Sequence, residues 1–205
     1  MIRRARAILA CERAASAAEF ALVLPILGLL LLGTIDAGRL MWEMNKAEKA
    51  TQMGVRYAIV SDPVATIVDN DFVGSDNIPG GDKVSVALFD NAVCTSAACD
   101  VTGTTKATGD IDTDAFDAIV AWMQKFDPTI AAEDVTVTYR NVGLGYAGNP
   151  TGPDVSPLTT IEVGNRTFTP LILFGAATLN LPPAKASLTL EDGDCSSTDE
   201  CGASN

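Results

Sequence analysis

Residues 14–35 form an apolar segment of 22 residues that is interrupted by a single charge, the carboxylate of Glu19. About 20 apolar residues are enough to cross a bilayer as a helix. Four arginines precede the segment, at positions 3, 4, 6 and 13. Because basic residues that flank a span stay in the cytoplasm, the segment predicts a membrane helix that places everything after Asp36 on the far side.

Three interpretations of this segment are open. A secretory signal peptide has similar basic and apolar regions, but the small-residue cleavage site after Leu32 is weak. A plain anchor explains the length and leaves Glu19 as a hydrated group near the headgroups. In the third interpretation, a peptidase cuts before the apolar helix, and Glu19 is kept for a function because a carboxylate near the lipid core is costly.

Charge divides the chain and limits its functions. Residues 1–60 carry 8 basic and 5 acidic groups, whereas residues 61–205 carry 6 basic and 21 acidic groups. An acidic domain is poorly suited to nucleic acid, which binds basic surfaces. Histidine is absent, which excludes Ser-His and Cys-His catalytic pairs. Since phosphate-binding and nucleophile motifs are also missing, we expect no enzyme, no cofactor and no metal site.

The N-terminal residues closely resemble a known family. Residues 12–25 read ERAASAAEFALVLP, residues 36–39 read DAGR, and residues 54–58 read GVRYA. Together they resemble TadE-like proteins, the minor pseudopilins of tight-adherence (Flp-type) type IV pilus systems. The resemblance is specific over residues 12–60 and loose beyond them.

The resemblance implies a processing site. In such proteins a prepilin peptidase cuts so that the glutamate becomes the fifth mature residue, which here places the cut between Ala14 and Ala15 and assigns that role to Glu19. The family has Gly before the cut, where this chain has Ala14. Glu19, with Phe20 and Pro25 at the family spacing, would carry recognition and assembly, and Glu19 would pair with the new N-terminal ammonium of a neighbouring subunit.

The helix is expected to continue beyond the membrane. Small and apolar residues recur at steps of three and four as far as Ala58, and Pro63 marks a stop. The expected organisation is a cytoplasmic basic leader (1–14), a long helix (15–60, with 15–36 in the membrane and 37–60 outside), an acidic extracytoplasmic domain (61–191) and an acidic flexible tail (192–205).

The expected fold class is α+β, in which the long pilin-like helix precedes a small antiparallel sheet of three or four strands with one crossing helix. Asp114 is expected to cap that helix, over residues 114–126. Apolar residues 171–174 are expected to pack against the long helix. Alternation predicts strands at residues 83–89, 134–140, 158–163 and 186–191.

Five cysteines occur, and Cys11 lies on the expected cytoplasmic side. Cys94, Cys99, Cys195 and Cys201 fall outside, where disulfides form. Local pairing of Cys94 with Cys99 and of Cys195 with Cys201 is one possibility, and cross-pairing is another; the sequence does not choose between them. Disulfides are favoured over a four-thiolate zinc site because neither spacing is C-x2-C.

These observations lead to a structural hypothesis, that of a minor pseudopilin acting through its helix. The resemblance implies as partners other pseudopilins and pilin subunits, prepilin peptidase, the inner-membrane assembly platform and the lipid bilayer. It implies a single-pass protein of the bacterial inner membrane, with a periplasmic or extracellular C-terminal domain that enters the pilus. The alternative is a membrane-anchored binding or adhesion module unconnected with pili; a secreted hydrolase is a remote third class.

Overall fold

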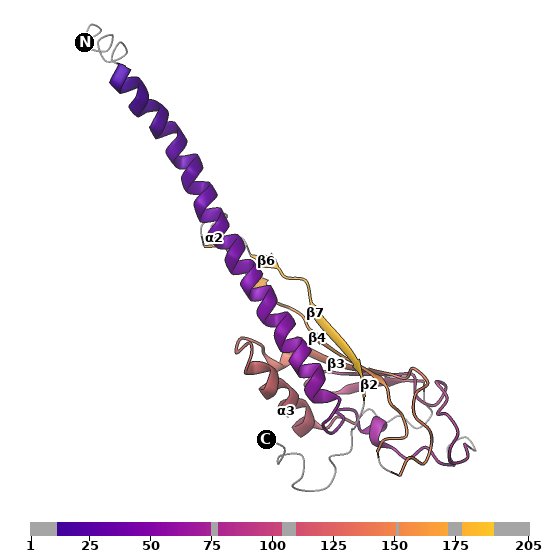
Figure 1. Ribbon diagram of the computed structural model, residues 1–205. Coiled ribbons are helices and arrows are strands. Elements are labelled where there is room, and N and C mark those ends of the chain that lie inside the picture. Colours follow the sequence, from indigo (N-terminus) through magenta and orange to yellow (C-terminus); the bar gives the residue numbers. More distant parts are fainter. Residues whose placement is uncertain (1–11, 75–77, 104–109, 151, 172–177, 191–205) are drawn as a thin grey trace. The chain divides into compact units, whose positions relative to one another are not determined.

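The computed structural model describes residues 12–74, 78–103, 110–150, 152–171 and 178–190. It is an α+β protein with a long N-terminal helix, a second helix and a small antiparallel sheet, as predicted (Figure 1). The chain divides into two compact units. Unit 1 consists of Met1–Glu43 and Thr167–Leu179, and unit 2 consists of Met44–Arg166 and Asn180–Asn205.

Helix α2 (Glu12–Ala58) is one continuous element of 47 residues. At 1.5 Å per residue it spans about 70 Å. The expected helix over 15–60 is therefore present, beginning three residues earlier and ending two residues earlier. The helix passes through Pro25 without ending, and its C-terminus falls where Ser61, Asp62 and Pro63 follow, since proline disfavours helix in the residue before it.

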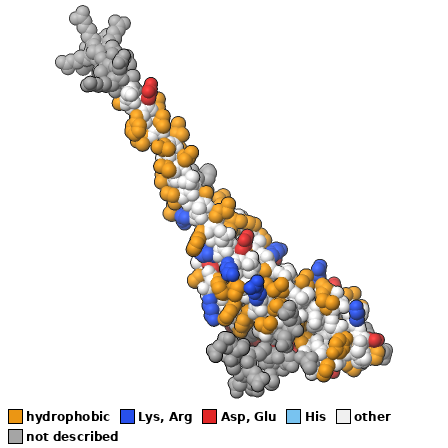
Figure 2. Space-filling view, viewed as in Figure 1, with side chains coloured by type: hydrophobic (Ala, Val, Ile, Leu, Met, Phe, Trp, Pro, Cys, Tyr) orange, Lys and Arg blue, Asp and Glu red, His pale blue; other side chains and the backbone are white. Residues whose placement is uncertain are grey.

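The part of α2 in unit 1 has an apolar, exposed surface. Its most apolar window has a mean hydropathy of 2.2, and none of that window is buried by the rest of the protein. Figure 2 shows hydrophobic side chains along this exposed helix. Among the described residues, this is the one helix that is long and apolar enough to cross a membrane. A surface of this kind suits lipid, because a helix satisfies its own backbone hydrogen bonds.

The part of α2 in unit 2 has a different surface, a stripe of mostly small buried residues. Gly54 is the point of closest approach, because a Cβ atom there would lie 2.6 Å from Cγ of Met123 and 3.4 Å from Cδ1 of Ile161. The stripe follows the helical spacing of three and four. Its members are Ala47, Ala50, Thr51, Gly54, Val55 and Ala58.

The main sheet has five antiparallel strands in the order β2-β1-β3-β4-β7. Buried and less buried side chains alternate along β3 and β4, so one face of the sheet forms the core of unit 2. The strands are β1 (Asn91–Cys94), β2 (Cys99–Thr102), β3 (Val135–Arg140), β4 (Leu158–Val163) and β7 (Ala184–Thr189). A separate two-stranded sheet pairs β5 (Thr167–Phe168) with β6 (Leu179–Asn180).

Helix α3 (Thr113–Gln124) contributes Phe116, Ile119 and Met123 to the core, and Figure 1 shows it beside the C-terminal half of α2. The predicted cap, Asp114, is wrong. Asp112 caps the helix, because its Oδ1 accepts hydrogen bonds from the backbone N–H groups of Asp114 and Ala115, both at 2.9 Å. Two short 3-10 helices, η1 (Thr66–Asp69) and η3 (Ala132–Asp134), connect the larger elements.

Two strand predictions need correction. Residues 83–89 form no strand, because Ser85 starts a turn: its carbonyl accepts from Leu88 N at 2.9 Å and its hydroxyl accepts from Ala87 N at 3.2 Å. The alternating pattern came from Val84, Leu88 and Phe89, which are buried from this turn. The last strand begins two residues earlier than predicted, at Ala184, whereas 134–140 and 158–163 agree with β3 and β4. The sheet also has five strands rather than three or four.

Tyr139 connects the sheet to the chain that leaves α2. Its ring is fully buried, and its hydroxyl oxygen accepts a hydrogen bond of 3.0 Å from the backbone N–H of Val64. Burial raises the pKa of Tyr139 well above its ordinary value, and the bond from Val64 lowers it by less. The phenol therefore stays neutral, and its oxygen satisfies a buried backbone donor.

Replacing Tyr139 by Phe tests this hydrogen bond. Tyr139→Phe keeps the ring but leaves the N–H of Val64 buried without an acceptor, so we expect the free energy of unfolding to fall by about 1–3 kcal/mol. Urea unfolding of the full chain in detergent measures the change. Tyr146→Phe is the matched control, because that side chain is exposed, and an equal effect in both variants would contradict the assignment.

Replacing Gly54 by Ala tests the close packing of α2. Alanine favours helix over glycine by up to about 1 kcal/mol, but the clash with the buried Met123 side chain costs about 1–3 kcal/mol. We expect net destabilisation in thermal unfolding, and relief of it when Met123→Val is added. Gly38→Ala is the control, since a Cβ atom at this position of the same helix would meet nothing within 4 Å; a neutral Gly54→Ala would show that the stripe is loosely packed.

Candidate assembly and processing site

The residues predicted to act in processing and assembly lie on the first turns of α2. The peptide bond between Ala14 and Ala15 falls inside the helical range, one turn before Glu19. Glu19 and Phe20 are both exposed. Within the described part of the chain, no hydrogen bond or ion pair holds the Glu19 carboxylate, so its charge is available to a group from outside the chain.

Pro25 lies six residues after Glu19 inside the helix. Its ring nitrogen carries no hydrogen, so the helix lacks one backbone hydrogen bond at this point. Gly28 follows, and a Cβ atom there would meet nothing within 4 Å. A partner helix can therefore approach this stretch closely, as small residues allow in membrane helices. The predicted residues thus share one helix, and no other element converges on them in the described structure.

A buried carboxylate marks the end of the apolar stretch of α2. Asp36 is 3% exposed, and its Oδ1 accepts hydrogen bonds from Arg39 Nη1 at 3.4 Å and from the backbone N–H of Leu171 at 3.1 Å. The Arg39 guanidinium group lies over the ring of Phe168, 5.3 Å from its centroid. All of these residues belong to unit 1, so residues 167–171 are held against the helix by a buried charge.

A second buried carboxylate, Asp127, lies in unit 2. Its Oδ2 accepts a hydrogen bond of 2.6 Å from Arg166 Nη1, and its Oδ1 accepts one of the same length from the hydroxyl of Thr129. The ammonium group of Lys46, on α2, lies 3.7 Å from Oδ1. The side chain of Asp127 is fully buried. This cluster therefore joins α2, the end of α3 and the chain after β4 through one charge.

The ionisation of Asp127 follows from these contacts. Burial raises the pKa of this carboxyl, but the hydrogen bonds from Thr129 and Arg166 and the charge of Arg166 lower it by more in total. The pKa of Asp127 consequently lies below its ordinary value of 3.8. At neutral pH the carboxylate is ionised and paired, as a buried charge must be.

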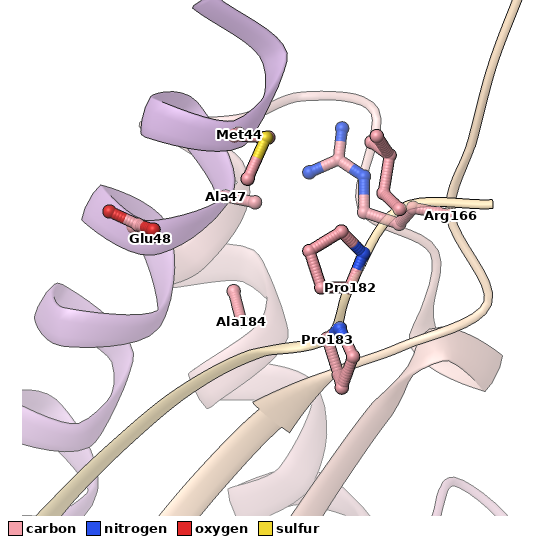
Figure 3. Close-up of a pocket in the computed structure, with 8 residues that line it drawn as sticks. Met44, Ala47, Glu48, Arg166, Pro182, Pro183 and Ala184 are labelled. Atoms are coloured by element: carbon pink, nitrogen blue, oxygen red, sulfur yellow. The ribbon is translucent and has the colours of Figure 1, made fainter. Parts of the chain in front are cut away.

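A small pocket lies beside this cluster (Figure 3). Its volume is about 40 Å³, and it is lined by Met44, Ala47, Glu48, Arg166, Leu181, Pro182, Pro183 and Ala184. Figure 3 shows Met44 of α2 pointing toward Arg166 and Pro182, with Glu48 turned away. A space of this size holds water but no organic ligand. No group of three or more metal-ligating side chains occurs among the described residues.

The cysteines are placed in part. Cys94 and Cys99 form a disulfide, which closes the turn between β1 and β2. Of the pairings that the sequence left open, the local one is thus present for this pair. Cys11, Cys195 and Cys201 lie outside the described residues, as does the apolar segment 172–174.

These features define an α+β protein whose apolar N-terminal helix fits a membrane anchor. A family model for TadE-like proteins matches residues 14–56 of the chain, which confirms the resemblance stated above. The match starts next to the expected cleavage point and covers α2 almost to its end. No curated protein and no solved structure matches the chain. TadE-like proteins are a structural, pilus-associated family, and the match to this family covers 43 of the 205 residues.

Neither buried carboxylate is predicted as a structural centre by the sequence. Asp36 stood in the quoted family pattern at residues 36–39, and its position at the end of an uncharged stretch was a signal that a partner must cover it. Asp127 lies between the end of α3 and Pro128, and nothing in its local sequence indicates a buried charge. Its partner Arg166 is 39 residues away in the sequence, and no local pattern could have joined them.

Acid unfolding tests the Asp127 cluster. Because the pKa of Asp127 is lower in the folded state, its stabilisation is fully present above the unfolded pKa of 3.8 and is lost as the pH falls through the folded pKa. We expect Asp127→Asn to lower the free energy of unfolding by about 3 kcal/mol at pH 7 and by much less in strong acid.

Urea unfolding at pH 7 and at pH 2 measures this dependence. The control is Asp117→Asn, an exposed carboxylate on α3, which should leave the pH dependence of the wild-type protein unchanged. An equal loss of stability for Asp127→Asn at both pH values would mean that packing, and not the charge, is what the side chain supplies.

Proposed function

We propose that the protein is a minor pseudopilin of a tight-adherence type IV pilus system, acting structurally through its N-terminal helix. One observation carries this proposal. The TadE-like match over residues 14–56 coincides with an exposed apolar helix whose carboxylate, Glu19, has no partner within the described chain. A surface with an uncovered charge in an apolar setting is suited to meeting another subunit.

The proposed processing step supplies the missing partner. A prepilin peptidase cuts between Ala14 and Ala15, and the new ammonium group of Ala15 then lies at the membrane edge. In an assembled bundle, the Glu19 carboxylate of one subunit pairs with the ammonium of its neighbour. The pair offsets the cost of keeping each charge in apolar surroundings. Phe20 and Pro25 shape the same stretch, for packing and for bending.

The proposed orientation places the N-terminus in the cytoplasm of a bacterium and the protein in the inner membrane. The leader, 1–14, carries the arginines that hold this orientation. Residues 15–36 cross the bilayer, residues 37–60 extend the helix, and residues 61–191 form the periplasmic or extracellular domain. The tail, 192–205, follows it. In this arrangement the extracytoplasmic domain selects among the partners.

The proposed partners are other pseudopilins, pilin subunits, prepilin peptidase and the inner-membrane assembly platform. Helix packing is the mode of contact in the membrane, since lipid gives helices no hydrophobic reason to associate and close fit decides. The protein enters the initiating complex of the pilus and is incorporated with it.

Substitution of Glu19 tests the proposal in the native strain. Glu19→Gln keeps the size of the side chain and removes its charge, so we expect pilus number to fall at least tenfold. Glu48→Gln is the matched control, because Glu48 is an exposed glutamate on the same helix, and it should leave piliation unchanged. Electron microscopy of the cells and sheared pilin yield give the result.

The mass of the protein from native membranes tests the processing step. A chain that begins at Ala15 is expected wherever prepilin peptidase is active, and the full-length mass is expected in a strain without it. The proposal is wrong if the wild-type protein keeps Met1 and Glu19→Gln leaves pili intact. Activity retained after an unrelated transmembrane helix replaces residues 15–36 would favour an anchored adhesion module instead.

A further inference from the structure

The stretch that runs from β5 through β6 to the start of β7 has an unusual composition. Residues 167–184 contain no charged side chain, in a protein of which 20% of the residues are charged. Arg166 and Lys185 stand at the two ends of this stretch of 18 residues. Leucine, isoleucine and phenylalanine occur within it, at positions 168, 171–174, 179 and 181. This composition is typical of a segment that contacts an apolar phase.

The structure fixes the first part of this segment at a defined level of α2. The backbone N–H of Leu171 donates a hydrogen bond of 3.1 Å to Oδ1 of Asp36, and Phe168 lies under the guanidinium group of Arg39. Asp36 is the first charged residue after Glu19. Leu171 is therefore held level with the point where the apolar stretch of the helix ends.

That level corresponds to the edge of the hydrocarbon layer. Residues 16–35 are 20 helical residues, which span about 30 Å, the thickness of the hydrocarbon core. Trp42 follows Asp36 by fewer than two turns and is exposed, and tryptophan is enriched where membrane meets water. With residues 15–36 in the bilayer, as proposed above, Leu171 lies beside the lipid and Trp42 among the headgroups.

The side chains at this level are uncovered. Leu171 is 70% exposed and Leu179 is 43% exposed. Between the helix and the segment lies an open depression of about 160 Å³ with an almost wholly apolar surface. Its lining comes from Gly33, Asp36, Ala37, Leu40, Phe168, Pro170 and Leu179. An exposed apolar surface at the membrane edge is stabilised by contact with other apolar groups. Lipid acyl chains always surround a membrane-anchored subunit, so they are available for this contact.

We propose that residues 167–171 and Leu179 form a second membrane contact, in which Leu171 and Leu179 enter the lipid beside α2 and acyl chains occupy the depression. This inference rests on the membrane anchorage in the proposed function. The carboxylate of Asp36 supports this contact. It is buried beneath the segment and bound by Arg39, and it accepts a hydrogen bond from the backbone N–H of Leu171, which leaves the leucine side chain exposed.

Depth-dependent quenching of tryptophan fluorescence tests the contact. The chain has two tryptophans, so Trp42→Phe and Trp122→Phe give a background without them. Leu171→Trp then reports on the segment. The full chain is reconstituted at low density into phosphatidylcholine vesicles whose acyl chains carry bromine at carbons 6 and 7. We expect at least a twofold loss of fluorescence relative to vesicles without bromine.

The matched control is Leu144→Trp in the same background. Leu144 is also a loop leucine, 50% exposed, and it lies in unit 2, so we expect its fluorescence to be unchanged by brominated lipid. Leu179→Trp is a second probe of the segment, in case Leu171→Trp does not fold. The inference is overturned if the probes in the segment are quenched no more than Leu144→Trp.

Two further outcomes separate the explanations. Emission from Leu171→Trp that is blue-shifted yet unquenched would overturn the lipid contact and indicate a protein neighbour, such as a second copy. Flotation of the vesicles tests the anchor by itself: protein that floats without quenching refutes only the second contact, whereas protein that does not float refutes the membrane anchorage on which both proposals stand.

Discussion

The structure depends on helix α2, which is exposed and apolar in its first part and packed against the core of unit 2 in its later part. Residues 16–35 of α2 expose mostly apolar side chains, with Glu19 as the one charge among them, and the backbone there needs no external partner because a helix satisfies its own hydrogen bonds. The later part has a stripe of small residues, and Gly54 brings the helix so near Met123 that a single methyl group would clash. Both surfaces belong to one uninterrupted helix, so the side-chain composition changes along its length while the backbone stays helical.

Buried carboxylates organise each unit separately. In unit 1, Asp36 holds the chain around Leu171 against the helix. In unit 2, Asp127 gathers Lys46, Thr129 and Arg166. Each is costly to bury, and the cost is offset by an arginine together with a backbone or hydroxyl donor. Glu19 is the contrast, since no described residue offsets its charge; this is why a function in association, and not in stability, is the one proposed for it.

Much of this fold could be predicted from the sequence, because its signals are local. The apolar run and the absence of proline between Pro25 and Pro63 specify the long helix, and the alternation at 134–140 and 158–163 specifies one strand each. The strand predicted at residues 83–89 is wrong, because buried apolar residues in a turn can give the same alternating pattern as a strand. The predicted cap failed by two residues because several aspartates compete near position 112. The Asp127 cluster and the contact between Asp36 and Leu171 join distant parts of the chain, and no local pattern encodes them.

The Cys94–Cys99 disulfide has a consequence for the edges of the sheet. Strand β2 has four residues and is linked to β1 by the disulfide at the turn. It therefore has few backbone groups along its outer edge, and the disulfide fixes its register against β1. Strand β7, at the opposite edge of the described sheet, has six residues and carries Lys185 and Leu188. The two edges of the described sheet therefore differ in the number of backbone groups along them, with more along β7 than along β2.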